Sequence, residues 1–203
     1  MVFFIGAGPG DVDLITVKGR NTITKADVLI YAGSLVSPKH LDFCKKGAKI
    51  YNSASMTLEE VIDVIQKAED EGKTTVRLHT GDPAIYGAIK EQMDELEKRN
   101  ISYQVIPGVS SFTAAAAAIK REFTLPNVSQ TVILTRVEGR TPVPPNEDLE
   151  KLASIGASMA IFLSVSMIDK VLAKLRKGYG RNVPIAVIER ATWEDERTII
   201  GTL

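Results

Sequence analysis

Short runs of apolar and β-branched residues alternate with stretches of helical periodicity along the whole chain, and this alternation limits the fold more than any other feature. Strands that alternate with helices are typical of α/β proteins with mostly parallel sheets. We therefore expect an α/β fold. The expected strands cover residues 2–5, 28–31, 75–78, 103–106, 131–135, 160–163, 185–188 and 198–203. The expected helices cover residues 16–26, 58–71, 85–99, 112–119, 147–155 and 167–176.

The helix expected at residues 58–71 has the clearest start and stop signals. Thr57 and Glu60 form a capping box, in which each side chain accepts a hydrogen bond from the other residue's backbone N–H. Gly72 follows the last periodic residue and is typical of a helix end. The apolar residues Leu58, Val61, Ile62, Ile65 and Ala68 share one face. This helix is expected to pack against the core and to carry no chemistry.

The composition excludes several classes of function. Lys and Arg together number 25 and so do Asp and Glu, so the formal net charge of the 203 residues is zero. A general nucleic-acid binder needs a basic excess to neutralise phosphates, so nucleic acid is not an expected partner. Cys44 has no second cysteine to pair with, and His40 and His79 lack the partners of a zinc site, so no metal site is expected. No apolar run is long enough to span a bilayer, and a cytoplasmic protein is the expectation.

Two segments break the periodicity in the second half of the chain. Residues 121–130 contain Pro126 and Asn127 and lack a helical pattern, so a domain boundary is expected there, with domains at residues 1–120 and 121–203. Residues 137–146 contain three prolines, which fix φ and remove backbone donors. That loop is expected to be semi-rigid and exposed.

A glycine-rich segment, GAGPGD at residues 6–11, follows the first expected strand. Its glycines allow a tight turn and a close approach to a ligand. A dinucleotide fingerprint would need glycine where Asp11 stands, and Pro9 interrupts the turn that should open a helix. Asp27 precedes the second expected strand, whereas a Rossmann fold places its ribose-binding acid after it. A nicotinamide cofactor is disfavoured, which leaves a structural turn or a loop that faces another ligand.

Two further glycine turns follow expected strands. In HTGDP at residues 79–83, Asp82 can cap a helix with Pro83 in its first turn, which is an ordinary structural role. PGVSS at residues 107–111 offers a serine cap to a helix of small side chains, which suits either tight packing or a ligand. Because open α/β sheets bind ligands at the carboxyl ends of their strands, the three turns are expected to converge on one crevice.

These motifs together resemble the tetrapyrrole methylase family. The resemblance extends from residue 2 to residue 203 and rests on five segments in order: residues 6–11, 80–87, 107–111, 189–192 and 201–203. Two further segments, YAGSLV at 31–36 and TRVEGRTP at 135–142, resemble one branch of the family. That branch methylates C11 of precorrin-4, with or without cobalt, in cobalamin biosynthesis.

The resemblance implies a homodimer of two-domain subunits that bind S-adenosylmethionine in a cleft between their α/β domains and release S-adenosylhomocysteine. The implied cofactor contacts are Pro9, Thr80, Gly81, Asp82, Ile85, Ser110, Ser111, Leu163, Ser164 and Ala191. The substrate's carboxylates need cationic partners, and the candidate contacts for the substrate are Ser34, Arg136 and Arg140, although the two arginines could equally be solvated loop charges. No general base is named.

Three alternatives stay open: another tetrapyrrole methylase of different carbon specificity, a protein methylase resembling diphthine synthase, and a non-catalytic nucleotide-binding module. Family members usually continue past the Gly-Thr-Leu of residues 201–203 with a helix and a strand that closes the cofactor pocket. The second domain is therefore expected to be truncated at its C-terminal end.

Overall fold

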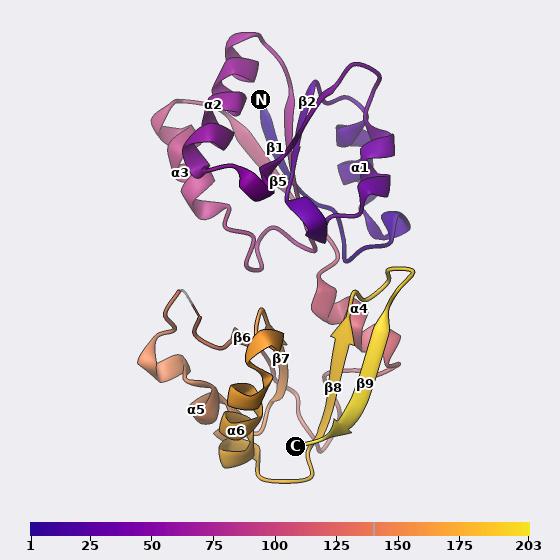
Figure 1. The fold of residues 1–203 in the computed structure, drawn as a ribbon, viewed down its shortest axis with the longest axis vertical. Coiled ribbons are helices and arrows are strands. Elements are labelled where there is room, and N and C mark those ends of the chain that lie inside the picture. The colour runs from indigo at the N-terminus through magenta and orange to yellow at the C-terminus, as the bar shows by residue number, and fades with distance from the viewer. Residues whose placement is uncertain (140) are drawn as a thin grey trace. The chain divides into compact units, whose positions relative to one another are not determined.

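The computed structural model describes residues 1–139 and 141–203, without the side chain of Ser34. These residues form two compact units (Figure 1). Unit 1 contains Met1–Ala114 together with Arg190–Glu196, and unit 2 contains Ala115–Glu189 together with Arg197–Leu203. The chain therefore returns to unit 1 for one short loop near its end. Within the described ranges, no helix is long and apolar enough to cross a membrane.

Unit 1 is built on a five-stranded parallel sheet with the strand order β3-β2-β4-β1-β5. The four strands expected in this half of the chain are confirmed. The sequence analysis missed the edge strand β3, which reads Lys-Ile-Tyr-Asn and in which most residues are exposed. The strands are β1 (Val2–Gly6), β2 (Val28–Tyr31), β3 (Lys49–Asn52), β4 (Thr75–His79) and β5 (Tyr103–Ile106).

Helices cover both faces of this sheet, as Figure 1 shows, with α2 and α3 on one side and α1 on the other. Successive residues of a strand point to opposite faces, so Phe4 packs towards α2 and α3 while Ile5 packs towards α1. Both side chains are fully buried. Burying a side chain of this size contributes roughly 1.5–3 kcal/mol. The helices of unit 1 are α1 (Val17–Ile23), α2 (Leu58–Asp70) and α3 (Lys90–Lys98), and α4 (Ser111–Ala118) begins in unit 1 and leads into unit 2.

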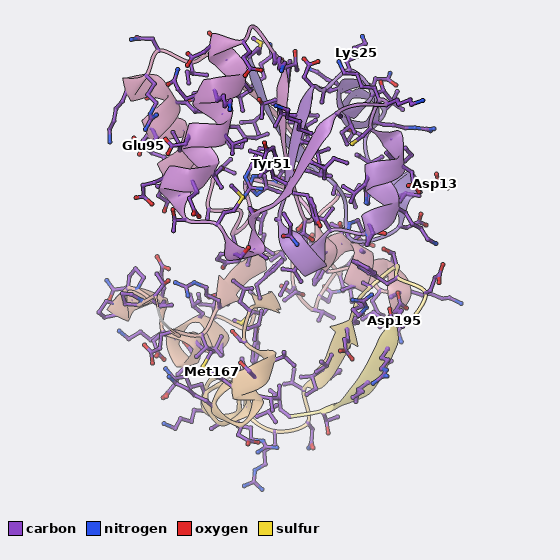
Figure 2. The ribbon with its side chains drawn as sticks, turned by 45° about the horizontal axis from the view of Figure 1, so that its top comes forward. Asp13, Lys25, Tyr51, Glu95, Met167 and Asp195 are labelled. Carbon is purple, nitrogen blue, oxygen red and sulfur yellow. The ribbon has the colours of Figure 1, made fainter. Side chains whose placement is uncertain are left out.

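The capping box at the start of α2 is confirmed: Glu60 N donates to Thr57 Oγ1 at 3.2 Å, and Thr57 N donates to Glu60 Oε2 at 2.8 Å. Figure 2 shows the charged side chains of Asp13, Lys25 and Glu95 at the periphery of this unit.

The helix expected at residues 85–99 begins later than the sequence indicates. Asp82 does not cap a helix, because the residues after it form an irregular turn in which Tyr86 and Ala88 have φ values of 54° and 49°. These left-handed conformations cannot occur inside a right-handed helix. α3 therefore starts only at Lys90.

Unit 2 contains two separate strand pairs. β6 (Val132–Arg136) and β7 (Ser158–Phe162) are parallel, whereas β8 (Pro184–Glu189) and β9 (Arg197–Thr202) form an antiparallel hairpin. The helices α5 (Leu149–Ser154) and α6 (Ile168–Tyr179) pack against each other and close a small core. The buried side chains of that core are Val137, Leu149, Ala153, Val171, Leu175 and Leu203. The four strands and two helices expected here are confirmed.

Candidate functional site

The three glycine turns converge at the carboxyl ends of β1, β4 and β5. A Cβ atom added to Gly6 would lie 2.5 Å from the carbonyl oxygen of Gly81 and 2.6 Å from the Cα atom of Gly108. Side chains cannot approach so closely, so Gly6 and Gly108 must be glycines for this backbone-to-backbone contact. The expected convergence is confirmed, and it places all three turns at the sheet edge where α/β proteins bind ligands.

Hydrogen bonds join the turns to one another. Gly81 N donates to Gly8 O at 2.8 Å, and Gly8 N donates to Gly81 O at 3.2 Å. Both carboxylate oxygens of Asp82 are also used. Oδ1 accepts from Ala84 N at 2.8 Å, and Oδ2 accepts from Gly108 N at 2.9 Å. The Asp82 side chain therefore fixes the shape of the second turn and ties the third turn to it.

One side of this cluster carries a polar group without a partner. Gly81 has a φ of +59°, and a Cβ atom there would lie 3.5 Å from Ser111 N, which is an ordinary contact distance. Ser110 is buried, yet its hydroxyl has no hydrogen-bond partner among the described residues. A buried hydroxyl without a partner needs an explanation, and a bound polar ligand provides one.

A fourth segment, the Arg190–Glu196 loop of unit 1, packs against the first glycine turn. Thr192 Oγ1 accepts from Asp11 N at 3.0 Å, and Trp193 Nε1 donates to Pro9 O at 2.9 Å. Ala191, a candidate cofactor contact, is buried in this loop. The sequence analysis overlooked Trp193. The available signal was that the only tryptophan of the chain stands directly after a family motif.

Two buried ionisable residues, Arg77 and His79, lie in β4, directly before the second turn. Burial, and secondarily the positive charge of Arg77, lowers the pKa of His79 to about 3, so the imidazole is neutral and a weak base. Burial also lowers the pKa of Arg77 to about 10. The Arg77 guanidinium donates to Gln92 Oε1 at 3.0 Å, and Gln92 Nε2 donates to Ala88 O at 2.9 Å. This chain of hydrogen bonds holds the strained turn that contains Ala88 and Ile85.

Asp27, which was considered as a ribose contact, has a structural role. It precedes β2 and therefore lies at the opposite end of the sheet from the glycine turns. Its Oδ1 pairs with Lys45 Nζ at 2.6 Å, and its Oδ2 accepts from Thr74 N at 2.9 Å. The hydrogen bond from Lys45 is the main reason that the pKa of this carboxyl is lowered. The argument against a dinucleotide fingerprint therefore agrees with the geometry.

The candidate contacts in unit 2 occupy loop positions. Leu163 follows β7 with a φ of 54° and is 67% exposed, which is unusual for a large apolar residue. The buried Ser164 hydroxyl donates to Phe162 O at 2.7 Å and accepts from Val137 N at 2.9 Å. Ser164 thereby joins the ends of β6 and β7.

The candidate substrate contacts are only partly described. The guanidinium of Arg136, a half-buried residue, donates to Pro142 O at 3.2 Å, within its own loop. Arg140 lies outside the described residues, and of Ser34 only the backbone, in a short 3₁₀ helix (Gly33–Leu35), is described. In the part of the chain that the structure covers, no group of three or more Asp, Glu, His and Cys residues could hold a metal ion.

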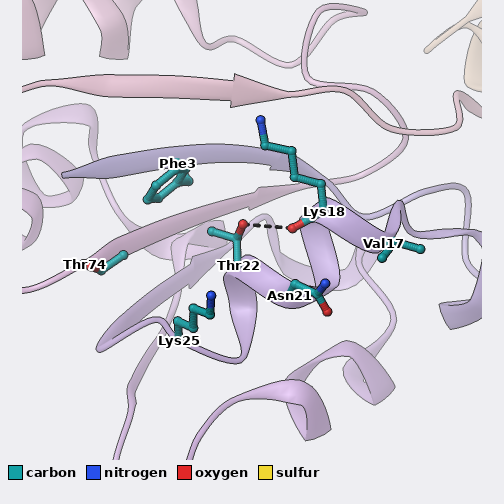
Figure 3. A pocket seen from close by; sticks show the side chains of 7 residues that line it. All are labelled: Phe3, Val17, Lys18, Asn21, Thr22, Lys25 and Thr74. Carbon is teal, nitrogen blue, oxygen red and sulfur yellow. Dashed lines mark hydrogen bonds between the residues drawn. The ribbon is translucent and has the colours of Figure 1, made fainter.

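A depression of about 720 Å³ lies beside α1, away from the glycine turns (Figure 3). Its lining residues come from α1 and the amino ends of β1 and β4, and each is exposed or half-buried. It is an open groove without the buried, convergent polar groups of the glycine cluster. The lining residues are Phe3, Val17, Lys18, Asn21, Thr22, Lys25 and Thr74.

The family model of the Tetrapyrrole (Corrin/Porphyrin) Methylases matches residues 1–203. The chain belongs to the tetrapyrrole methylase family. The resemblance inferred from the sequence motifs is thus confirmed, and so is the α/β fold.

A cobalt-precorrin-4 C(11)-methyltransferase of Methanocaldococcus jannaschii is 60% identical over 203 residues, which are 100% of this chain and 78% of that protein. A precorrin-4 C(11)-methyltransferase of Sinorhizobium sp is 46% identical over 100% of this chain and 80% of that protein.

Solved structures of other tetrapyrrole methylases have the same fold. The X-ray structure of a cobalamin biosynthetic enzyme, cobalt precorrin-4 methyltransferase, CbiF, superposes with a TM-score of 0.96 at 47% identity and covers 99% of this chain and 84% of its own. A uroporphyrin-III C-methyl transferase from Thermus thermophilus, complexed with S-adenyl homocysteine, has a TM-score of 0.80 at 26% identity. That alignment covers 98% of this chain and 82% of the other.

Proposed function

We propose that this chain is an S-adenosylmethionine-dependent methyltransferase that methylates C11 of precorrin-4 or cobalt-precorrin-4 in cobalamin biosynthesis. The observation that carries the cofactor part of this proposal is the convergence of three glycine turns beside the unpartnered hydroxyl of Ser110. The substrate follows from relatives with that activity in their names, which are 44–60% identical over the whole chain. A uroporphyrinogen III methyltransferase of Methanosarcina barkeri is 34% identical.

The residues of the glycine cluster fit S-adenosylmethionine. The Ser110 hydroxyl offers a hydrogen-bond donor to the polar groups of such a ligand, and Gly81, whose φ is positive, presents backbone without a side chain beside it. When bound, S-adenosylmethionine supplies an activated methyl group on its sulfonium. The proposed contacts in unit 1 are Pro9, Thr80, Gly81, Asp82, Ile85, Ser110, Ser111 and Ala191, and those in unit 2 are Leu163 and Ser164.

The task of this chain's residues is to bind and orient the two reactants. Correct orientation of two reactants can lower a barrier by roughly 7–11 kcal/mol, and a methyl donor that is already activated needs little more. His79 is a weak base because of its low pKa, and the carboxylate of Asp82 is occupied by two backbone N–H groups. We therefore assign these two residues no proton-transfer step.

The substrate's carboxylates are the proposed partners of Arg136, Arg140 and Ser34. Arg136 donates to the carbonyl oxygen of Pro142, and within the part of the chain that the structure describes its remaining N–H groups would be available for a carboxylate. A planar guanidinium binds a carboxylate through two parallel hydrogen bonds. A homodimer in the cytoplasm completes the proposal.

Transfer to a different ring carbon is the second candidate, favoured by the structural likeness to the uroporphyrin-III methyl transferase. The purified chain should be incubated with ¹³C-methyl S-adenosylmethionine and, separately, with precorrin-4, cobalt-precorrin-4 and uroporphyrinogen III. We expect one added methyl on a precorrin-4 form, located at C11 by NMR, and no gain on uroporphyrinogen III. A methyl at another carbon would support the second candidate, and no transfer to any of the three would contradict both.

A further inference from the structure

The indole of Trp193 lies against the backbone of the first glycine turn. A Cβ atom on Gly10 would collide with the indole atoms Cδ1 and Nε1 and would lie 2.9 Å from Cγ. Gly8 has a positive φ, whereas Gly10 does not, so the backbone conformation at position 10 does not require a glycine. The absence of a side chain there is explained by the ring that occupies the space.

Two hydrogen bonds from the Arg190–Glu196 loop fix the orientation of this turn. Trp193 Nε1 donates to Pro9 O at 2.9 Å, and Asp11 N donates to Thr192 Oγ1 at 3.0 Å. The two bonds hold the peptide groups on either side of Gly10. Because Pro9 has no N–H and its carbonyl accepts from Trp193, the Pro9 ring is the part of this residue that we expect to face a ligand.

The loop itself is held in shape by its own side chains. The Arg190 guanidinium lies 3.9 Å from the centre of the Trp193 ring, and Arg190 Nε donates to Asp195 Oδ1 at 2.6 Å. Arg190 and Thr192 have φ values of 51° and 72°. Residues in such conformations persist when surrounding contacts determine them, and they cluster at functional sites. A loop with a fixed shape can hold the turn it contacts in one conformation.

We propose that Trp193 is a positioning residue for the cofactor site, which holds Pro9 and the rest of the first glycine turn in the ligand-binding conformation. The inference rests on the proposed function, because it assumes that the turn contacts S-adenosylmethionine. Trp193 acts through Pro9 and Gly10, and its loss lowers cofactor affinity more than it lowers the stability of the fold.

The test uses the fluorescence of the indole, because Trp193 is the only tryptophan of the chain. Titration of the parent protein with S-adenosylhomocysteine should change the intensity or wavelength of its emission, since the ligand contacts the turn on which the indole lies. The Kd for the same ligand should be measured by calorimetry in the parent and in three variants, each of which is also unfolded in urea.

Trp193→Phe keeps a ring and removes the N–H donor, and we expect a three- to tenfold rise in Kd with a urea midpoint close to that of the parent. Gly10→Ala keeps the indole but displaces it, and it should raise Kd at least as much and shift the emission without ligand. The control is Lys39→Ala. This variant removes the exposed ion pair that Lys39 Nζ forms with Oε1 of Glu194, in the Arg190–Glu196 loop, at 2.5 Å. It should leave the Kd within twofold of the parent value.

Suppose that the parent binds S-adenosylhomocysteine, but Trp193→Phe has the same Kd and the emission of the parent does not respond to the ligand. This result would overturn the positioning role of Trp193 and leave the proposed function standing. Equal Kd increases in Trp193→Phe and in the Lys39→Ala control would also overturn that role. A parent that binds no S-adenosylhomocysteine would overturn the proposed function and this inference with it.

Discussion

A methyl group added at Gly6 has no room, so Gly6→Ala is the most direct test of the glycine cluster. The new carbon would lie 2.5 Å from Gly81 O, 2.6 Å from Gly108 Cα and 2.7 Å from Gly108 N. Ordinary contact distances begin near 3.5 Å, so these neighbours must move by roughly 1 Å. Since both are backbone groups, no side chain can rotate away to relieve the collision.

The expected cost of Gly6→Ala follows from what must be displaced. Overpacking of a buried site costs roughly 1–3 kcal/mol. The displacement also weakens the hydrogen bond from Gly8 N to Gly81 O and the one from Gly108 N to Asp82 Oδ2, each of which contributes about 1 kcal/mol. We expect the free energy of unfolding to fall by about 2–4 kcal/mol and the affinity for S-adenosylhomocysteine to fall at least tenfold.

Urea unfolding followed by circular dichroism and calorimetric titration measure the two effects of Gly6→Ala. Gly201→Ala is the matched control, because Gly201 also lies near the end of a strand and a Cβ atom there would meet nothing within 4 Å. The control should match the parent in both assays. A Gly6→Ala variant with the parent's urea midpoint and Kd would refute the assignment of this cluster as a close-packed ligand site.

The other predictions concern ligand choice, substrate and pH. Calorimetry should detect binding of S-adenosylhomocysteine and none of NAD, and the reverse preference would contradict the methyltransferase proposal. Gly81→Leu should abolish S-adenosylhomocysteine binding yet largely retain the circular dichroism of the parent, because its side chain would start 3.5 Å from Ser111 N and occupy the space proposed for the ligand. Arg136→Ala should weaken tetrapyrrole binding about tenfold to a hundredfold and leave the cofactor Kd unchanged, with Arg136→Lys in between. Equal losses for both ligands would indicate damage to the loop instead. The pKa of His79 is lowered from 6.5 to about 3, so its contribution to stability is complete above pH 6.5 and is lost towards pH 3. The free energy of unfolding, measured in urea, should therefore fall more steeply with acid in the parent than in His79→Leu, by up to about 1.4 kcal/mol per pH unit, and parallel slopes would contradict the assigned burial.

Local patterns were sufficient for most of the fold and for the three glycine turns. The strands with apolar runs, the capping box at Thr57 and the turns after β1, β4 and β5 are each specified by residues that are neighbours in sequence. The edge strand Lys49–Asn52 was missed because an exposed strand needs no apolar run.

Long-range contacts determine the features that local patterns could not predict. The sequence analysis placed residues 85–89 in a helix, but Arg77, 15 residues before Gln92, donates to Gln92 Oε1, and Gln92 Nε2 donates to Ala88 O in a left-handed turn. The contact between Trp193 and Pro9 joins residues 184 positions apart. No pattern in the vicinity of either residue indicates the other, so the sequence alone predicted Pro9 and Ala191 as contacts but not the ring that holds this turn.

The return of Arg190–Glu196 to unit 1 has a consequence for how the protein is made. On the ribosome, all five strands of the first sheet have been synthesised once residue 106 is added, but Trp193 follows Pro9 by 184 residues. At ordinary rates of translation, the 87 residues from 107 to 193 take roughly 4–17 seconds to add. The sheet of unit 1 can therefore assemble early while its first glycine turn still lacks its two hydrogen bonds to the late loop. A nascent chain in this interval would bind S-adenosylmethionine weakly, and the site would reach full affinity only after the Arg190–Glu196 loop has been synthesised.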